Sequence, residues 1–276
     1  GSNSFQKNES GPKGEVGLKA SLEFEAFQTT LSAHGIEILK FEEDLKAQTP
    51  DALFPNNWFW QMPDGQVFIS AMFAPNRRRE VRQDILDRVG GKIVHDFRPQ
   101  IEAGYFLEGT GSIVFDHAHK LAYACVSPRT SAKLVQEFAS ICGYKAVLFT
   151  SRDTGGQEIY HTNVMMAVGT QNVVINLASI TDPREREKVV ASITASGKSI
   201  VDITHAQMGS FAGNMLLLQN RAGEKFWVCS TRAFESFTPE QSQRLQSEGE
   251  ILHAPLTTIE DYGGGGARCL MAEIWA

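Results

Sequence analysis

The sequence predicts an α/β protein whose five similar units form a five-bladed α/β propeller in one domain. Three observations carry this prediction: a glycine that recurs at nearly equal steps, a helical pattern before each glycine, and a small or polar residue that precedes an apolar run later in each unit. The recurring glycines are Gly35, Gly91, Gly143, Gly197 and Gly249, with separations of 56, 52, 54 and 52 residues. Near-equal steps along 276 residues indicate an internal repeat.

Each recurring glycine ends a segment with the pattern of an amphipathic helix. Glycine adopts the left-handed conformation that closes many helices at low cost, and a short apolar run typical of a strand follows it here. Two segments also begin with a capping residue before a proline, at Asp182-Pro183 and Thr238-Pro239. The predicted helices span residues 21–34, 77–89, 130–141, 183–195 and 238–247.

The strands are predicted from a second set of positions. A small or polar anchor precedes an apolar run in every unit, and in the first four units a turn then leads to a returning strand. Each unit therefore has the order ββαβ, with two strands, a helix and a third strand. The anchors are Asn57, Ser112, Asn163, Asn214 and Cys269, at spacings of 55, 51, 51 and 55 residues.

Such units cannot bury their apolar faces singly, but they can do so around a common axis. We expect residues 21–276 to form one propeller domain and the polar residues 1–20 to be poorly ordered. The fifth unit reaches Ala276 without its returning strand. A closed ring would take that strand from the chain before the helix at 21–34.

The composition favours a cytoplasmic protein with reduced thiols. A formal net charge of −6 offers no basic surface for nucleic acid or an anionic membrane, and no apolar run approaches the ~18 residues of a spanning helix. The four cysteines form no C-x-x-C pair, which argues against a disulfide framework and a structural zinc site. Asp116, His117 and His119 are interpreted as a hairpin turn rather than a metal site, and residues 77–79 as a solvated helix start.

If the equivalent strands run toward one end of the axis, the residues at their anchors meet there. One cysteine, one histidine and one glutamate then come from three different units, a combination that suits covalent catalysis. A Cys269 thiolate can attack an electrophilic carbon, while His161 serves as acid and base and Glu108 orients the substrate. Singly, each also has an ordinary interpretation, as a buried thiol, a structural histidine and a turn carboxylate. The expected cluster comprises Asn57, Glu108, His161, Asn163, Asn214 and Cys269.

Six short motifs follow one another along the chain. They are Thr49-Pro-Asp-Ala-Leu-Phe-Pro-Asn-Asn-Trp58, Leu107-Glu-Gly-Thr-Gly111, Ser127-Pro-Arg-Thr130, Tyr160-His-Thr-Asn163, Phe211-Ala-Gly-Asn-Met215 and Gly263-Gly-Gly-Gly-Ala-Arg-Cys269. As an ordered set they resemble the pentein superfamily of guanidino-group-modifying enzymes, which are fivefold α/β propellers with a central cysteine, histidine and glutamate. From about residue 35 onward the chain looks most like the amidinotransferase-like citrulline-utilisation hydrolases.

The resemblance implies roles for particular residues. Cys269 would be the nucleophile, His161 the general acid and base, and Glu108 a contact to the nitrogens of the substrate. Arg129 would bind the α-carboxylate of a free amino acid, because a guanidinium forms a bidentate fork with a carboxylate. Asp51 falls where related enzymes hold the amino-acid end of the substrate. No metal or organic cofactor is expected, and a homodimer is compatible with the sequence.

Two positions depart from the pattern of many guanidine-hydrolysing relatives, which carry aspartate where this chain has Asn57 and Asn163. Asn214 is a third amide expected at the substrate. A cationic guanidinium offers only donors and suits carboxylates, whereas a neutral ureido group also has a carbonyl acceptor that suits an amide. The prediction is therefore a hydrolase that converts citrulline to ornithine, ammonia and carbon dioxide. The alternatives are an arginine or dimethylarginine deiminase-type hydrolase, an amidinotransferase, and a non-enzymatic propeller that acts as a binding module.

Overall fold

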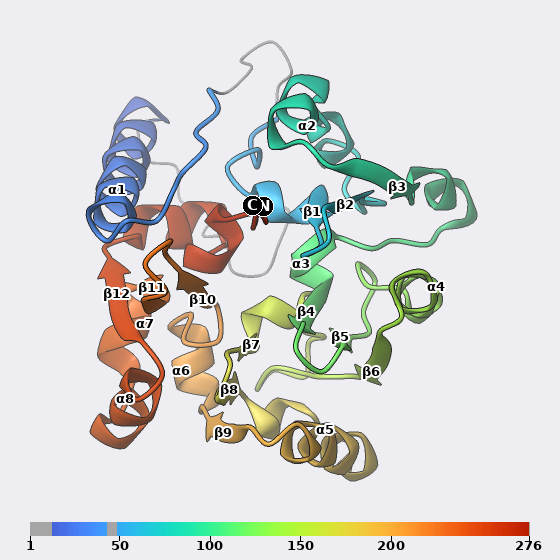
Figure 1. Cartoon of the computed structure of the whole chain (residues 1–276), viewed down its shortest axis with the longest axis vertical. Coiled ribbons are helices and arrows are strands. Elements are labelled where there is room, and N and C mark those ends of the chain that lie inside the picture. The colour runs from blue at the N-terminus through green and yellow to red at the C-terminus, as the bar shows by residue number, and fades with distance from the viewer. Residues whose placement is uncertain (1–12, 43–48, 276) are drawn as a thin grey trace.

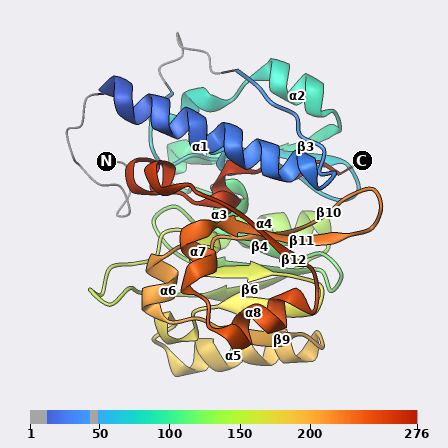
Figure 2. The same cartoon turned by 90° about the vertical axis from the view of Figure 1, so that its left-hand side faces the viewer.

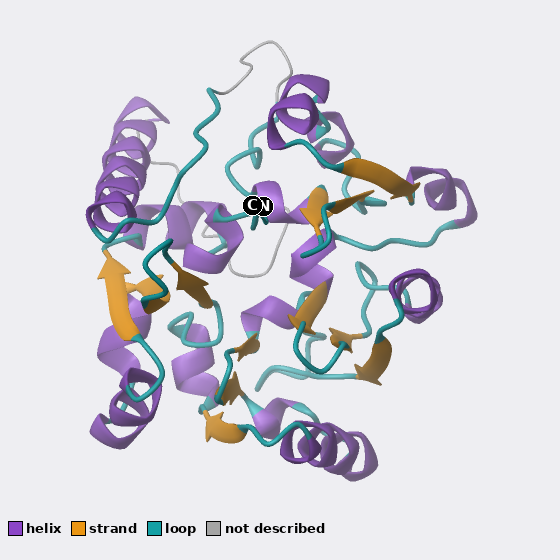
Figure 3. Cartoon of the chain, viewed as in Figure 1, coloured by secondary structure: helices purple, strands orange, loops and turns teal. Residues whose placement is uncertain are grey.

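The computed structural model describes residues 13–42 and 49–275, which fold into four small sheets with helices on their outer side (Figures 1 and 3). The α-helices are α1 (Lys13–Ala33), α2 (Gln83–Val89), α3 (Gly109–Ser112), α4 (Ala132–Cys142), α5 (Pro183–Ala195), α6 (His205–Gly209), α7 (Thr231–Ser236) and α8 (Pro239–Gln246). The strands are β1 (Phe59–Gln61), β2 (Gln66–Ile69), β3 (Lys92–Asp96), β4 (Ile113–Asp116), β5 (Leu121–Cys125), β6 (Lys145–Phe149), β7 (Met166–Val168), β8 (Asn172–Ile175), β9 (Ser199–Asp202), β10 (Leu216–Gln219), β11 (Lys225–Ser230) and β12 (Glu250–Ala254). The mixed α/β class is thus confirmed.

All four sheets have the same topology. In the second sheet, β4 pairs antiparallel with β5, and β5 pairs in parallel with β6 after the chain crosses over through α4. A parallel pair needs such a crossover, and a helix is its usual form. The sheets β1-β2-β3, β7-β8-β9 and β10-β11-β12 repeat this arrangement, so the ββαβ order is confirmed in four units.

The first strand of each sheet lies nearest the common centre of the four sheets, and the helices lie at the periphery (Figure 1). Helix α1 packs beside β12, and the chain then continues through residues 36–42 without forming a described strand (Figure 2). Residues 271–275 likewise form no strand. Closure of a fifth sheet remains a prediction. Its returning strand was sought within residues 1–20, of which 13–20 belong to α1 and 1–12 lie outside the described residues.

Three predicted helices agree with α4, α5 and α8 to within two residues at each end. Helix α1 begins at Lys13 rather than at residue 21, so the predicted start was too late. The helix predicted over 77–89 is two elements, a 3₁₀ helix η2 (Arg77–Glu80) and α2. They are separated because Val81 and Arg82 are extended, at ψ angles of 115° and 120°.

The glycine after α4, Gly143, ends its helix as predicted. The last glycine of the repeat, Gly249, has a different structural role. Gly143 has a φ of 68° and caps α4. Gly249 has no positive φ, and a Cβ there would lie 2.6 Å from the backbone oxygen of Lys225. Glycine is required at position 249 because a neighbouring strand lies so close, and not because of a left-handed helix end.

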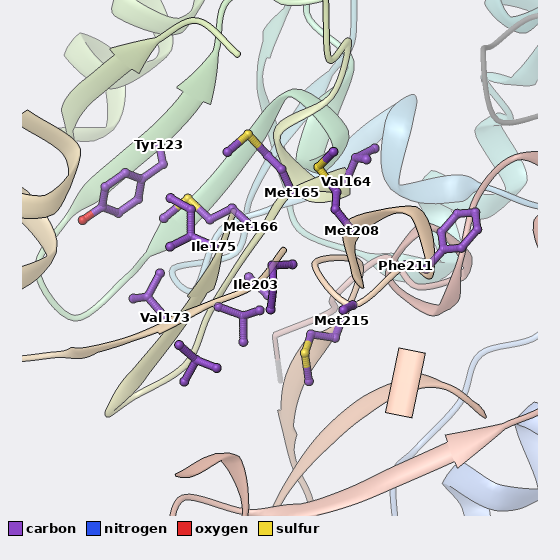
Figure 4. Packing of buried hydrophobic residues seen from close by; sticks show 14 of the residues in the cluster. Tyr123, Val164, Met165, Met166, Val173, Ile175, Ile203, Met208, Phe211 and Met215 are labelled. Atoms are coloured by element: carbon purple, nitrogen blue, oxygen red, sulfur yellow. The ribbon is translucent and has the colours of Figure 1, made fainter. Parts of the chain in front are cut away.

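The largest described apolar core joins the second, third and fourth sheets to the helices that cover them. Its residues come from β5, β6, β7, β8, β9, β11 and β12 and from α5, α6, α7 and α8. Figure 4 shows Met165, Met166, Met208 and Met215 among its aliphatic and aromatic side chains. The pair Met165 and Met166 is buried. Within residues 13–42 and 49–275, no helix is long and apolar enough to cross a membrane.

Candidate active site

Cys269 lies in a short 3₁₀ helix, η7 (Ala267–Leu270), directly after the glycine run. Its Sγ atom is 3.3 Å from Nδ2 of Asn214 and 3.6 Å from Nδ2 of Asn163. The orientation of the Asn214 amide is unambiguous, because its Oδ1 accepts a hydrogen bond from the backbone N–H of Arg268 at 3.1 Å. Its NH₂ group therefore donates to the sulfur and to the backbone oxygen of Asn163, 2.9 Å away.

These contacts act on the ionisation of the thiol. Burial raises the pKa of Cys269, while the hydrogen bond from Asn214 and the nearby charge of Arg268 act to lower it. Two other buried cysteines have no comparable pair of amide donors in the described structure: burial raises the pKa of Cys125 to about 11 and that of Cys229 to about 12. Burial is the largest of these influences, so the pKa of Cys269 is raised overall, while its sulfur accepts hydrogen bonds from two side-chain amides.

His161 and Glu108 form a buried pair. Nε2 of His161 is 2.7 Å from Oε2 of Glu108, and the other carboxylate oxygen accepts a hydrogen bond from the backbone N–H of Phe73 at 2.9 Å. Burial opposes ionisation of Glu108, but the bond to His161, with the charges of Arg129 and Arg77, lowers its pKa to about 2. Glu108 is therefore an acceptor at neutral pH, so Nε2 of His161 carries the proton.

The same pair leaves Nδ1 of His161 as the basic nitrogen. Burial lowers the pKa of His161, which keeps the imidazole neutral near pH 7. Gly111 allows the ring to lie this close: a Cβ at position 111 would be 2.9 Å from Nδ1 of His161 and 2.5 Å from Nδ2 of Asn57. The imidazole and the Asn57 amide thus both face the backbone at Gly111. Nδ1 of His161 carries no proton and is able to accept one.

Two amide atoms in this cluster have no hydrogen-bond partner among the described residues. They are Nδ2 of Asn57 and Oδ1 of Asn163, and both residues are at most 3% exposed. A buried polar atom without a partner costs about 1–3 kcal/mol, so such atoms are expected to find one in the working protein. One atom is a donor and the other an acceptor.

Arg129 lies next to the glutamate. Its Nη1 atom is 3.5 Å from Oε2 of Glu108, and its guanidinium lies 4.6 Å from the ring centre of Tyr160. Burial raises the pKa of Tyr160, and the charges of Cys269, Arg129 and Glu108 also act on its hydroxyl group, which donates to the backbone oxygen of Gly264 at 3.5 Å. Tyr160 therefore links the histidine–glutamate pair to the glycine run before Cys269.

Asp51 is also buried, but it meets the cluster through Arg77. The Asp51 backbone oxygen accepts from Nη2 of Arg77 at 3.3 Å, and Nη1 of Arg77 donates to Oδ1 of Asn57 at 2.7 Å. The interpretation of Arg77 as part of a solvated helix start was wrong, because the residue is only 3% exposed and pairs with Glu80 at 2.8 Å. The spacing of an arginine and a glutamate three residues apart was the available signal.

The structure thus places all eight sequence-predicted site residues in the interior, each at most 8% exposed. Asn163 and Asn214 contact Cys269, Glu108 contacts His161 and Arg129, and Asn57 and Asp51 are joined by Arg77. The described residues contain no group of three His, Cys, Asp or Glu side chains suited to a metal ion.

A cavity of about 1240 Å³ lies beside this cluster, and Glu80, the partner of Arg77, lines it. Its lining also comes from α1, residues 35–42, residues between 49 and 59, the inner strands β4, β7 and β10, and residues 270–275, and neither Cys269 nor His161 lines it. Arg268 does line the cavity, so Arg268 and Cys269, which are adjacent in η7, lie in different environments.

Comparison with known proteins identifies the family. A family profile described as N,N-dimethylarginine dimethylhydrolase, eukaryotic, matches residues 1–276. The chain belongs to this family. The resemblance to guanidino-modifying enzymes of the pentein type is thereby confirmed, and with it the expectation of a hydrolase that acts on C–N bonds. No curated protein matches the sequence.

Solved structures of similar fold agree. The apo structure of ArgZ, an arginine dihydrolase from the ornithine–ammonia cycle in cyanobacteria, has a TM-score of 0.72 at 14% identity and covers 94% of this chain. This chain spans only 38% of that protein. A substrate-bound structure of the N-terminal domain of ArgZ has a TM-score of 0.71 at 14% identity, and the match covers 93% of this chain and 87% of that domain. A dimethylarginine dimethylaminohydrolase adduct with S-methyl-L-thiocitrulline has a TM-score of 0.64 at 15% identity, covering 92% of this chain and 87% of its own.

Proposed function

We propose that this protein is a cysteine-dependent hydrolase of the ureido or guanidino group of a free amino acid, with citrulline as the preferred substrate and ornithine as the product. One observation carries the proposal: a buried thiol accepts hydrogen bonds from two amides, and one of these, Asn163, lies two residues along the chain from a histidine held by an ionised glutamate. That combination provides a nucleophile and a proton carrier without a cofactor.

The chemistry follows from these atoms. The Cys269 thiolate adds to the ureido carbon, and the two amide donors that stabilised the thiolate hold the sulfur in place. Nδ1 of His161 takes up the proton of the thiol when the thiolate forms and then gives this proton to one nitrogen of the tetrahedral adduct. That nitrogen is expelled, and a thiocarbamate carbonyl remains on sulfur. Nδ1 of His161 then accepts a proton from water, which attacks that carbonyl and frees the thiol. The second carbon–nitrogen bond is lost from the resulting carbamate, so that citrulline and water become ornithine, ammonia and carbon dioxide.

The preference for citrulline rests on the two unpartnered amide atoms. Asn57 offers a donor and Asn163 an acceptor, and a neutral ureido group can satisfy both, whereas a guanidinium has no acceptor to give to Asn57. Arg129 is proposed to hold the α-carboxylate and Asp51 the amino-acid end of the substrate. Asn214, expected to bind substrate, is proposed to act mainly on the thiol, because its NH₂ group contacts the sulfur.

Hydrolysis of arginine or of a methylated arginine is the main alternative, and the family and the arginine dihydrolase structures favour it. The deciding experiment measures kcat/KM on citrulline, arginine, agmatine and methylated arginines, with detection of ornithine, citrulline and ammonia. A kcat/KM on arginine equal to or above that on citrulline would overturn the preference.

The same assay repeated with glycine tests whether an amine replaces water as the acceptor, as in an amidinotransferase. A purely binding role predicts that Cys269 fails to react with a substrate-like thiol alkylator at any pH at which activity is sought.

We also propose that the domain is a five-bladed propeller. The cavity between α1, residues 36–42 and residues 271–275 lies where a fifth sheet would have its middle strand. An N-terminal extension that carries an apolar strand should therefore raise the thermal midpoint of the protein, and an extension without effect would count against closure.

A further inference from the structure

Arg77 uses its guanidinium to connect η2 with residues 51–57 in the interior. Nε and Nη2 each donate to the Glu80 carboxylate at 2.8 Å, Nη2 also reaches the backbone oxygen of Phe54 at 3.1 Å, and Nη1 donates to Oδ1 of Asn57 at 2.7 Å. Arg77 and Glu80 are both 3% exposed. Charged groups are found at such depth only when they are paired and hydrogen-bonded.

The contact to Asn57 determines which way that amide points. A guanidinium has only donors, so Asn57 must turn its carbonyl oxygen toward Arg77. The NH₂ group is then directed to the other side, where Gly111 and the imidazole of His161 lie. This is the Asn57 atom that lacks a partner among the described residues.

We propose that Arg77 is a positioning residue that determines substrate preference through Asn57. It locks the amide with a hydrogen-bond donor toward the reacting group, so this side of the site recognises an acceptor, the carbonyl oxygen of a ureido group, and disfavours the NH₂ group of a guanidinium. The inference rests on the proposed function.

The same arginine explains how a single exchange could reverse the preference. An aspartate at position 57 would give one oxygen to Arg77 and turn the other toward the reacting group, as an acceptor for a guanidinium. A structural role for Arg77 predicts something different. Loss of the tie between residues 51–57 and η2 would lower activity on every substrate by the same factor.

The test compares kcat/KM for citrulline and for arginine in the full chain. Because Arg77→Gln alone would leave Glu80 buried without its partner, the variant is the neutral pair Arg77→Gln with Glu80→Gln. Glu80→Gln alone is the matched control, since it weakens the buried ion pair but keeps Nη1 of Arg77 on Asn57. The double variant should lower the citrulline-to-arginine ratio about tenfold, the size of one misplaced hydrogen bond, and the control should leave the ratio unchanged. An equal loss on both substrates in the double variant would overturn the inference.

A second readout does not depend on turnover. The side-chain NH₂ resonances of Asn57, assigned by their disappearance in Asn57→Asp, should be dispersed and slow to exchange with solvent in the wild type and in Glu80→Gln. They should become averaged in the double variant, and unaltered resonances there would also overturn the inference. If the wild type hydrolyses neither substrate, the proposed function fails, and this measurement still decides whether Arg77 holds the amide.

Discussion

The two sides of η7 differ in almost every respect. On one side, Cys269 accepts hydrogen bonds from amides of two other units of the repeat, and it does not line the cavity of about 1240 Å³. On the other side, Arg268 lines that cavity and forms its side-chain hydrogen bonds within its own segment, to the backbone oxygen of Met271 at 2.8 Å and to Glu273 at 3.0 Å. Two adjacent residues thus belong to a packed polar cluster and to an open, mainly apolar space.

The difference teaches where a repeated α/β unit can carry chemistry. At the beginnings of the inner strands, short helical turns such as η1 (Pro55–Asn57) and η4 (Thr162–Val164) carry polar side chains that bond to another unit. Asn56 donates to Thr110, and Asn163 donates to Cys269. At the far ends, the chain leaves the centre through turns, and α1 and the terminal segment enclose space instead. Substitutions on the two sides should therefore affect different properties.

The largest effect is expected at the thiol. Cys269→Ala should lower kcat by about a thousandfold or more, because it removes the nucleophile, while a small buried truncation leaves the fold intact. Activity and thermal unfolding are measured on the same preparation. Cys229→Ala is the matched control: it truncates a buried thiol in the core and should lower stability while the activity of the folded protein is retained. Undiminished turnover in Cys269→Ala would refute the assigned nucleophile.

The next largest effect is expected at Glu108→Gln, which keeps the shape of the side chain and removes its charge. The histidine loses its ionised acceptor, so kcat should fall about a hundredfold.

The same variant tests the pH dependence of stability. Because the pKa of Glu108 in the folded protein is about 2, below its ordinary value of 4.5, the unfolded chain takes up the proton first as the pH falls. The stability contributed by Glu108 is therefore present above pH 4.5 and is lost between pH 4.5 and pH 2. Thermal unfolding should show a steeper decline over this range in the wild type than in the variant, and parallel curves would contradict the assigned charge.

A smaller effect is expected at the amides that face the sulfur. Asn214→Ala removes a donor at 3.3 Å that acts to lower the pKa of Cys269, so this pKa should rise further. The measurement is the rate of alkylation of Cys269 as a function of pH. Asn163→Ala removes the longer contact, 3.6 Å, and should cause a smaller shift in the same direction. A larger shift for Asn163→Ala would show that the two donors are ranked wrongly.

The smallest effect is expected in the cavity. Ala20→Leu places an apolar side chain from α1 into this space and should raise the free energy of unfolding by about 0.5–1 kcal/mol without changing kcat. Ala26→Leu, on the exposed face of the same helix, is the control for helix propensity and should be nearly neutral. A change in kcat for Ala20→Leu would show that the two sides of η7 are coupled.

The sequence by itself determined the repeating unit and the composition of the cluster. Glycine and proline act locally, so the ends of α4 and α5 were readable. The nearly equal spacing of the anchors placed Glu108, His161 and Cys269 at or beside corresponding positions of their units. That spacing could be read without coordinates, because equivalent positions in repeated units occupy equivalent places in a fold.

Only the tertiary structure decided the environment of each side chain. Arg77 stands between polar residues and was predicted to be solvated, yet it is buried because Glu80, Asn57 and backbone oxygens of residues 51–54 supply its partners. The orientation of Asn57 and Asn214 also depends on what lies across from them in space. The sequence does not show whether an asparagine directs its carbonyl oxygen or its NH₂ group toward a given neighbour. A neighbour that can only donate, such as a guanidinium or a backbone N–H, determines this orientation.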